Sequence, residues 1–234
     1  MSTNPTPISY IFSSEILIKT CPLPSSMIIS KGLRRHRNAH NKLSTVTVSA
    51  SKIEPLSALL KRHKKHLEYN VMEHLIESIG RQLQSLEYEN KAISNFNLDD
   101  ITVFHDINNP DILYFAITND EKIHDINESN NIVITTPYSS TASGSMKASS
   151  PSFHSPEFKE FLAKKSLPYE IHFKSGYYSF GLLCMYCYVS RSSALLATST
   201  STSTPVDSII NTKIYWFLKQ VLRENPTERR YICA

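Results

Sequence analysis

Apolar residues recur along the chain with two different spacings, and each spacing predicts its own kind of element. The first fifty residues hold short runs of β-branched and aromatic residues separated by breakers such as Pro22 and Pro24. Runs of this kind are typical of β-strands. The predicted strands are residues 8–12, 15–19, 27–30 and 45–49.

Farther along, apolar residues recur every three or four positions, which is the spacing of an amphipathic helix. One helix is expected to begin near Pro55, because a proline in the first helical turn sacrifices no hydrogen bond. A second carries an apolar stripe from Val71 to Leu86. The other predicted elements are strands at 101–104 and 112–117 and helices at 155–161, 173–189 and 211–222. Residues 173–189 are apolar on every side, so that helix is predicted to be buried.

These elements predict an α+β fold in two parts. Residues 1–52 form a small β-containing part or arm, and residues 53–234 form a larger, mainly helical part. Segments 139–152 and 190–206 are rich in Ser and Thr. Such segments bury too little apolar surface to order themselves, so both are predicted to be flexible.

Composition narrows the class of protein. The chain has 234 residues, 41% of them hydrophobic, and a net charge of +4. It contains neither a long apolar run nor a basic start before one, so we expect no membrane span and no signal peptide. Cys184 and Cys187 have the spacing of a redox or zinc motif, but they lie in an apolar helix with no second pair nearby. We interpret them as core thiols of an intracellular protein in a reducing compartment, such as the cytoplasm.

Basic residues cluster at 31–42 and again at 61–66. Clustered cations attract polyanions, so a nucleic-acid-binding module is one hypothesis. No aromatic residues interleave to stack bases. The simpler interpretation is a solvated helix or loop at 31–42 and a helix end at 61–66, and nucleic acid is not expected as a partner.

One acid and one distant base are predicted to pair. Glu157 opens the helix expected at 155–161, and Arg229 lies near the end of the chain. A guanidinium binds a carboxylate through two parallel hydrogen bonds, a geometry that lysine does not supply. We predict a structural ion pair between Glu157 and Arg229.

Three short motifs around these residues occur in a familiar order. They are Ser-Pro-Glu at 155–157, Tyr-Ser-Phe-Gly at 178–181 and Asn-Pro-Thr-Glu-Arg at 225–229. They resemble the Ala-Pro-Glu, Trp-Ser-Leu-Gly and Asp-Pro-x-x-Arg of the C-terminal lobe of Ser/Thr protein kinases. The resemblance covers residues 53–234 and implies a kinase-like fold with a reduced N-terminal lobe. The chain is also similar to divergent kinase-like proteins of large DNA viruses, which would place it in a host cell.

The parts that a kinase uses to hold nucleotide are absent or changed. With five glycines in the chain, no G-x-G-x-x-G can be written. Residues 16–19 are similar to the Val-Ala-Ile-Lys of the family, which would make Lys19 the phosphate-binding lysine. No acid occurs between Glu15 and Glu54, so the family's Lys–Glu pair has no counterpart.

The catalytic loop is changed in the same way. Alignment on the strand that follows it puts Asn95 at the catalytic aspartate and Asp100 at the metal-binding asparagine, although a shifted alignment favours Asp99. An amide does not accept a proton as a carboxylate does. No Asp-Phe-Gly occurs, and Asp120 is the nearest acid to its expected place. Gly176 replaces the aspartate that begins the central helix of the family.

The sequence therefore predicts a pseudokinase that binds or scaffolds an unidentified protein partner. We assign no catalytic, nucleotide-binding or metal-binding residues and expect no cofactor. One alternative is an active Ser/Thr kinase that uses ATP and Mg²⁺ with Lys19, Asp99 or Asp100, and Asp120. The other is a nucleic-acid-binding module that uses residues 31–42 and 61–66.

Overall fold

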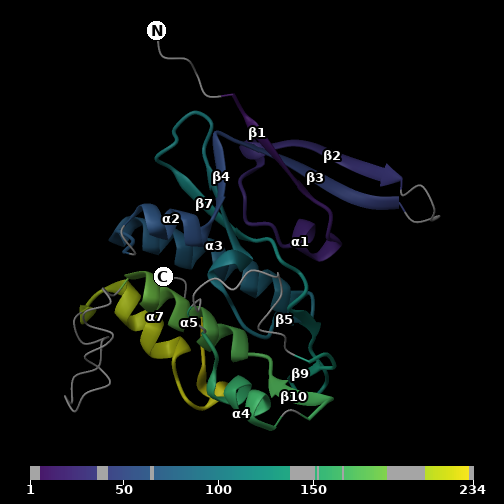
Figure 1. The fold of residues 1–234 in the computed structure, drawn as a ribbon, viewed down its shortest axis with the longest axis vertical. Helices are drawn as coiled ribbons and strands as arrows, with labels where there is room; N and C mark the ends of the chain where they lie inside the picture. The colour runs from purple at the N-terminus through teal and green to yellow at the C-terminus, as the bar shows by residue number, and fades with distance from the viewer. Residues whose placement is uncertain are drawn as a thin grey trace. The chain divides into compact units, whose positions relative to one another are not determined.

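The protein is an α+β protein built from small antiparallel sheets and helices (Figure 1). The computed structural model describes residues 6–35, 42–63, 66–137, 151, 153–164, 166–188 and 209–231. They belong to two compact units. Unit 1 comprises residues 1–86 and 98–121, and unit 2 comprises residues 87–97 and 122–234. The boundary predicted at residue 52 lies inside unit 1.

The first sheet of unit 1 has three antiparallel strands in the order β1-β3-β2. The strands are β1 (Ile8–Phe12), β2 (Ile28–Arg35) and β3 (Lys42–Ala50). The strand predicted at 45–49 lies inside β3, and the one predicted at 27–30 begins one residue later and runs on to Arg35. The basic stretch 31–42 was predicted to be a helix or loop. That prediction is wrong for the residues described, since 31–35 and 42 are paired strand.

The strand predicted at 15–19 is a short helix, α1 (Glu15–Lys19). Its backbone bonds are helical, because the N–H of Ile18 donates to the carbonyl of Ser14 at 3.0 Å. Leu17 alone among its five residues is buried. The β-branched composition of the run suggested a strand, but one buried position and a local hydrogen-bonded turn decide the conformation. A 3₁₀ turn, η1 (Ser25–Met27), precedes β2.

The second sheet of unit 1 has the order β4-β6-β7, again antiparallel. Its strands are β4 (Lys52–Pro55), β6 (Ile101–His105) and β7 (Leu113–Ile117), with the 3₁₀ turn η2 (Leu98–Asp100) before β6. The helices are α2 (Leu56–Arg62) and α3 (Tyr69–Tyr88), whose last two residues belong to unit 2. Pro55 is the cap before α2 rather than part of its first turn. The strands predicted at 101–104 and 112–117 and the long helix over 71–86 are confirmed.

A buried amide joins α3 to β7. The side chain of Gln82 is fully buried; its Nε2 donates to the carbonyl of Ile117 at 3.2 Å and its Oε1 accepts from the N–H of Ile117 at 2.7 Å. A buried amide that satisfies both partners fixes one register between two elements. The pair therefore sets how the helix sits on the sheet.

A buried carboxylate on β4 is held by three cations or donors. Glu54 accepts hydrogen bonds from Lys52 at 2.9 Å, from Nε2 of His105 at 2.8 Å, and from Arg62. Burial by itself raises the pKa of Glu54, but the hydrogen bonds from Lys52 and His105 and the charges of Arg62 and Lys52 outweigh it and hold the pKa below its usual value. Glu54 therefore ties β4 to β6 and to α2.

Replacing Glu54 with glutamine is expected to lower the free energy of unfolding by about 1–3 kcal/mol at neutral pH, because His105 loses its charged acceptor. The folded-state pKa lies below the unfolded value of about 4.3. The stability that Glu54 contributes is therefore present above the unfolded pKa and is lost as the pH falls through the folded pKa. Urea unfolding of wild type and variant should show a difference that narrows below about pH 4.

The matched control is Glu77→Gln on the exposed face of α3, where the acid pairs with Arg81 four residues on. That exposed pair should contribute about 0.5 kcal/mol or less. Equal effects of the two substitutions at neutral pH would contradict the role given to Glu54.

Unit 2 is built from two strand pairs and three helices among its described residues. The pairs are β5 (Lys91–Ile93) with β8 (Ile123–Asp125), and β9 (Asn131–Ile134) with β10 (Tyr169–His172). The helices are α4 (Pro156–Lys164), α5 (Ser175–Tyr188) and α7 (Lys213–Val221), followed by the 3₁₀ turn η4 (Pro226–Glu228). The three helices predicted for this half of the chain are confirmed.

Helix α5 is central to unit 2, and most of its residues are buried. Phe180 packs against Phe96, with ring centres 5.4 Å apart, and against Phe217 of α7 at 6.0 Å. Cys184 and Cys187 are buried free thiols, and burial raises the pKa of both. Thiols held protonated in this way are poor nucleophiles and metal ligands, as expected for core residues.

Across the described parts of the chain, every helix is too short or too polar to cross a bilayer. The segments predicted to be flexible, 139–152 and 190–206, lie outside the described residues apart from Pro151.

Candidate functional site

The guanidinium of Arg229 lies at the centre of unit 2 and uses all five of its donors. It donates from Nη1 to Glu157 and from Nη2 to the second oxygen of Glu157 at 3.0 Å. The remaining bonds go to backbone carbonyls of Lys174 at 3.2 Å, Arg223 at 2.8 Å and Glu224 at 2.9 Å. The side chain is 0% exposed. The two residues predicted to pair are thus joined by a bidentate contact.

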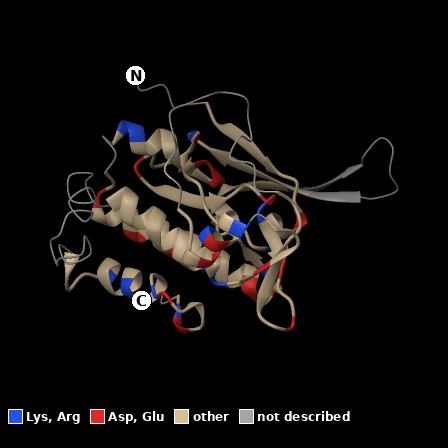
Figure 2. Cartoon of the chain, turned by 60° about the horizontal axis from the view of Figure 1, so that its bottom comes forward, with Lys and Arg blue, Asp and Glu red and all other residues tan. Residues whose placement is uncertain are grey.

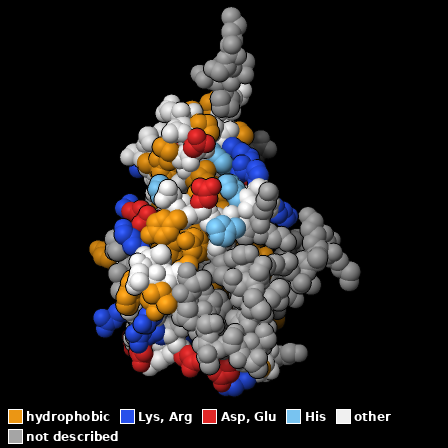
Figure 3. Space-filling view, turned by 90° about the vertical axis from the view of Figure 1, so that its left-hand side faces the viewer, with side chains coloured by type: hydrophobic (Ala, Val, Ile, Leu, Met, Phe, Trp, Pro, Cys, Tyr) orange, Lys and Arg blue, Asp and Glu red, His pale blue; other side chains and the backbone are white. Residues whose placement is uncertain are grey.

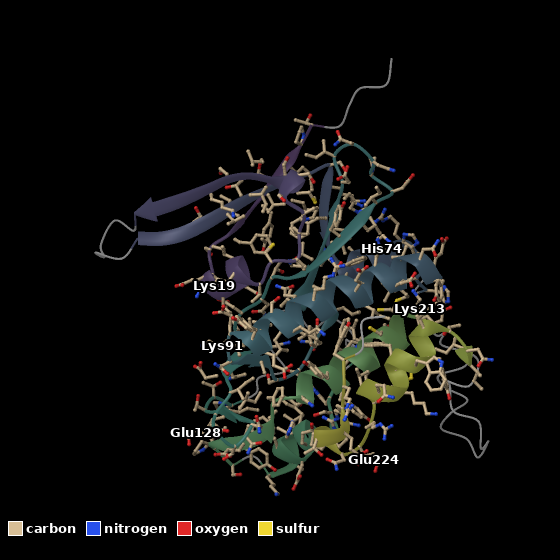
Figure 4. The ribbon with its side chains drawn as sticks, turned by 180° about the vertical axis from the view of Figure 1, so that it is seen from behind. Lys19, His74, Lys91, Glu128, Lys213 and Glu224 are labelled. Carbon is tan, nitrogen blue, oxygen red and sulfur yellow. The ribbon has the colours of Figure 1, made fainter. Side chains whose placement is uncertain are left out.

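The pair connects three segments that are distant in sequence. Glu157 stands in the first turn of α4, and Lys174 precedes α5. Glu224, labelled in Figure 4, and Arg229 flank η4. The η4 turn is itself capped, because the side chain of Asn225 accepts from the N–H of Thr227 at 3.0 Å. The Asn-Pro-Thr-Glu-Arg sequence therefore forms a capped turn, and the buried side chain of Arg229 at its end contacts Glu157.

The charges of this pair act on the pKa values of two neighbouring side chains, Tyr178 and His172. The ring centre of Tyr178 lies 4.8 Å from Cζ of Arg229, which is a cation–π contact. Burial raises the pKa of the Tyr178 hydroxyl, although Arg229 opposes it. Burial also lowers the pKa of His172, as do the charges of Lys174 and Arg229, against the opposing charge of Glu157. His172 accepts from the N–H of Lys174 at 3.2 Å, which suits the neutral ring.

A chain of buried serines holds the loop that follows β5. Ser175 donates from Oγ to the carbonyl of Ser94 at 3.0 Å, and its Oγ lies 2.7 Å from that of Ser155. Ser155 in turn accepts from the N–H of Phe158 at 3.2 Å and so caps α4. The hydroxyl of Ser175, at the start of α5, therefore holds the loop. The resemblance implies an aspartate in this role at the next position, which is Gly176 in this chain.

Ser179, one turn further along α5, extends this network. Its Oγ accepts from the N–H of Phe96 at 2.7 Å and donates to the carbonyl of Phe153. Phe96 and Phe153 are themselves joined as an antiparallel bridge. Gly176 adds a steric component, because a Cβ at that position would overlap the carbonyl oxygen of Ile93. Helix α5 therefore packs its backbone directly against the loop.

Within unit 2, the residue aligned with the catalytic aspartate is held as part of the core. Asn95 is 1% exposed, and its Oδ1 accepts from Oγ of Ser94 at 3.3 Å. A primary amide neither accepts the proton of an attacking hydroxyl nor carries the charge that balances a metal ion. Asn95 is therefore a buried amide of the loop that contacts Ser94.

The acids proposed for an unorthodox active site lie in unit 1 and are engaged locally. Asp99 accepts from the hydroxyl of Ser57. Asp100 is buried, and its Oδ1 accepts from Nδ2 of Asn119 at 3.0 Å. Asp120 is exposed. Among the residues that the structure describes, no group of three or more His, Cys, Asp or Glu side chains is arranged to hold a metal ion.

Lys19 does not occupy a strand position as its Ile-Leu-Ile-Lys context suggested. It ends α1, where its Nζ lies 3.4 Å from a carboxylate oxygen of Glu15, one turn before it (Figure 4). Both side chains are at least half exposed. This is the local pair of an exposed helix rather than a clamp for phosphates.

Comparison with known proteins leaves the family open. No family model matches the chain, and no curated protein matches it significantly.

The sequence analysis did not predict that Ser175 and Ser179 hold the loop through hydrogen bonds. Ser179 belongs to the Tyr-Ser-Phe-Gly motif, so a polar residue inside an otherwise apolar helix was a usable signal: a buried hydroxyl needs partners. Ser175 carried no such signal, because it stands at the helix start, where serine is common for local reasons.

Proposed function

We propose that the chain is a catalytically degenerate protein kinase-like domain that acts by binding or scaffolding another protein. One contrast within unit 2 carries the proposal. The Glu157–Arg229 pair makes every bond that a guanidinium offers. In the loop at 94–97, the buried amide of Asn95 stands where the resemblance implies a catalytic carboxylate.

The order of elements supports the same assignment. The loop at 94–97 precedes the hairpin of β6 and β7, and an acidic turn containing Asp120 follows the hairpin, as the resemblance implies for a catalytic loop, two strands and a metal-binding turn. Helix α5 follows Lys174, whose carbonyl accepts a hydrogen bond from Arg229. The resemblance implies the same order of features for a kinase-like domain.

Phosphoryl transfer requires parts that the described residues of this chain do not assemble. It depends on positioned cations over the phosphates, a carboxylate that orients the nucleophile, and acids that hold metal ions. In this chain Lys19 pairs within its own helix, Asn95 is an amide, and Asp100 accepts a hydrogen bond from Asn119. A retained framework without these parts favours a binding role.

An exposed aromatic group on α7 is consistent with protein binding. Trp216, the sole tryptophan of the chain, is 54% exposed, and Nζ of Lys219 lies 5.2 Å from its ring centre. Exposed hydrophobic side chains are set among charged ones on the face drawn in Figure 3. Tryptophan is among the residue types enriched at interface hot spots. Its fluorescence offers a reporter for partner titrations.

The experiment is a phosphotransfer assay with labelled ATP, Mg²⁺ or Mn²⁺, and a generic Ser/Thr substrate. We expect transfer no greater than that of heat-denatured protein, both for the wild type and for Asn95→Asp, since one restored carboxylate does not rebuild the missing clamp. Metal-dependent transfer that disappears in Asp100→Asn or Asp120→Asn would establish the active-kinase alternative instead.

A further inference from the structure

Helix α7 buries one side in unit 2 and leaves the opposite side exposed. Its buried residues are Ile214, Phe217, Leu218 and Val221, and Phe217 packs against Phe180 of α5. Successive residues of a helix are rotated by about 100°, so residues 213, 216 and 219 lie together on the side away from this apolar stripe. The helix is therefore anchored by its apolar stripe and presents the other side to solvent.

The exposed side of α7 carries a tryptophan between two lysines. Lys213, Trp216 and Lys219 are all exposed, and residues three positions apart are neighbours on a helix surface. Nζ of Lys219 lies 5.2 Å from the ring centre of Trp216 and 5.7 Å from that of Tyr215. The indole and the two ammonium groups thus form one surface. We call Lys213, Trp216 and Lys219 the α7 face.

The α7 face belongs to a basic stretch of the chain. No Asp or Glu occurs from residue 208 to residue 223, and the acids that follow, Glu224 and Glu228, lie past the end of the helix. Glu228 pairs with Arg223 at 3.1 Å. Figure 2 shows this distribution, with basic residues on α7 and acids in the turn after it. A partner that complements this face must therefore carry negative charge.

Two other anionic ligands fit the α7 face less well than a protein does. A helix that binds a membrane surface inserts its apolar side, whereas the apolar side of α7 is buried in unit 2. Single-stranded nucleic acid stacks its bases on aromatic rings. The ammonium of Lys219 already lies over the indole, and the ring of Tyr215 stands at 79° to that of Trp216, so the two rings form no continuous stacking platform.

The spacing of the two lysines defines the partner segment. Lys213 and Lys219 are six residues apart, which corresponds to about 9 Å along the helix axis. Two acids three residues apart in an extended chain are separated by about 10 Å. An apolar side chain between such acids would lie over Trp216, and a tryptophan at the centre of an interface contributes much of its binding free energy.

We propose that the α7 face is the surface used in the binding role proposed above, on which this assignment rests, and that it binds an acidic segment of the partner protein. Two carboxylates of the segment pair with Lys213 and Lys219. An apolar side chain between them packs on Trp216.

The test is the fluorescence anisotropy of a labelled twelve-residue peptide of three Glu-Leu-Ser-Glu repeats, titrated with the full chain at low salt. Trp216→Ala should weaken binding by about tenfold or more. Lys213→Gln with Lys219→Gln should weaken it by about fivefold or more, the effect of two exposed ion pairs. Lys213→Arg with Lys219→Arg should bind as the wild type does. Because Trp216 is the sole tryptophan, its emission reports this site and should shift to shorter wavelength when the peptide covers the ring.

The matched control removes the same charge from α4, as Lys159→Gln with Lys164→Gln, two exposed lysines of unit 2. It should bind the peptide as the wild type does. A peptide with glutamine in place of every glutamate should not bind, and added salt should weaken binding of the acidic peptide. Circular dichroism and melting midpoints identify variants that remain folded, and the arginine pair provides a second folded comparison.

Four outcomes would overturn the proposal. They are no binding of the acidic peptide at millimolar concentration, an equal loss in the α4 control, tighter binding of a thymidine oligonucleotide than of the peptide, and tighter binding of phosphatidylserine vesicles than of the peptide. The second would mean attraction by net charge alone. Metal-dependent phosphotransfer in the assay described above would contradict the degenerate kinase-like framework and leave peptide binding unchanged, so the two proposals fail separately.

Discussion

Replacing Arg229 with alanine is expected to lower the free energy of unfolding by about 3–5 kcal/mol, the range for breaking a buried ion pair. The substitution removes five hydrogen bonds at once and leaves the Glu157 carboxylate and three backbone carbonyls without their donor. In a protein of this size a loss of about 3 kcal/mol lowers the melting midpoint by roughly 6–12 °C. Arg229→Lys should recover little of the loss, because an ammonium does not reproduce the planar fork.

A double-mutant cycle isolates the pair from the rest of the network. Glu157→Gln, Arg229→Ala and the double variant should give a coupling free energy of about 1 kcal/mol or more, measured by urea unfolding. The control is Arg230→Ala, an exposed arginine next in sequence, with an expected effect within about 0.5 kcal/mol. Absence of coupling between Glu157 and Arg229 would remove the main support for a kinase-like unit 2.

The second large effect is expected at Gly176. An alanine Cβ there would press on the main-chain carbonyl oxygen of Ile93, which has no side-chain freedom with which to move aside. Overpacking of this kind costs about 1–3 kcal/mol, more than the fraction of a kcal/mol that alanine gains in a helix. We expect a net loss of about 2 kcal/mol in unfolding free energy and faster hydrogen exchange of the loop amides at 94–96.

Gly181→Ala in the same helix provides the comparison. Its Cβ would lie 2.6 Å from Cγ2 of Val221 and 2.9 Å from Cδ2 of Leu222, which are side-chain rather than main-chain atoms. Leu222 can shift, whereas Val221 is buried and stiff at χ1, so part of the crowding remains. The expected loss is smaller than at Gly176, about 1 kcal/mol, since the mid-helix gain of alanine offsets part of the crowding. If Gly176→Ala were as stable as the wild type, the close approach of α5 to the loop would not be a constraint.

Elements with a long and regular apolar pattern were predictable from the sequence. The stripe from Val71 to Leu86 specifies α3, because it fits only the helical period. The unbroken apolar run of α5 specifies a buried helix, because at 14 residues it is too long for a typical strand. The Glu157–Arg229 contact was predictable for a different reason. A guanidinium and a carboxylate form a specific bidentate pair, and both residues lie in recognisable motifs.

Short elements were not predictable, because tertiary contacts decide them. Residues 15–19 have the composition of a strand, yet form a helix with one buried face. The basic residues 31–35 gain strand structure from pairing with the next strand, β3, rather than from an apolar pattern of their own. Likewise Glu54 and His105 lie 51 positions apart, and nothing in either neighbourhood indicates that they meet.

The measurement that tests the central claim most directly is thermal melting with and without ATP and Mg²⁺. A ligand at a hundred times its dissociation constant stabilises a protein by about 2.7 kcal/mol, which corresponds to a rise of roughly 5–10 °C here. A kinase-like framework that has lost its nucleotide chemistry predicts no metal-dependent rise at millimolar ATP. A clear rise that requires Mg²⁺ would show a working nucleotide site and contradict the account.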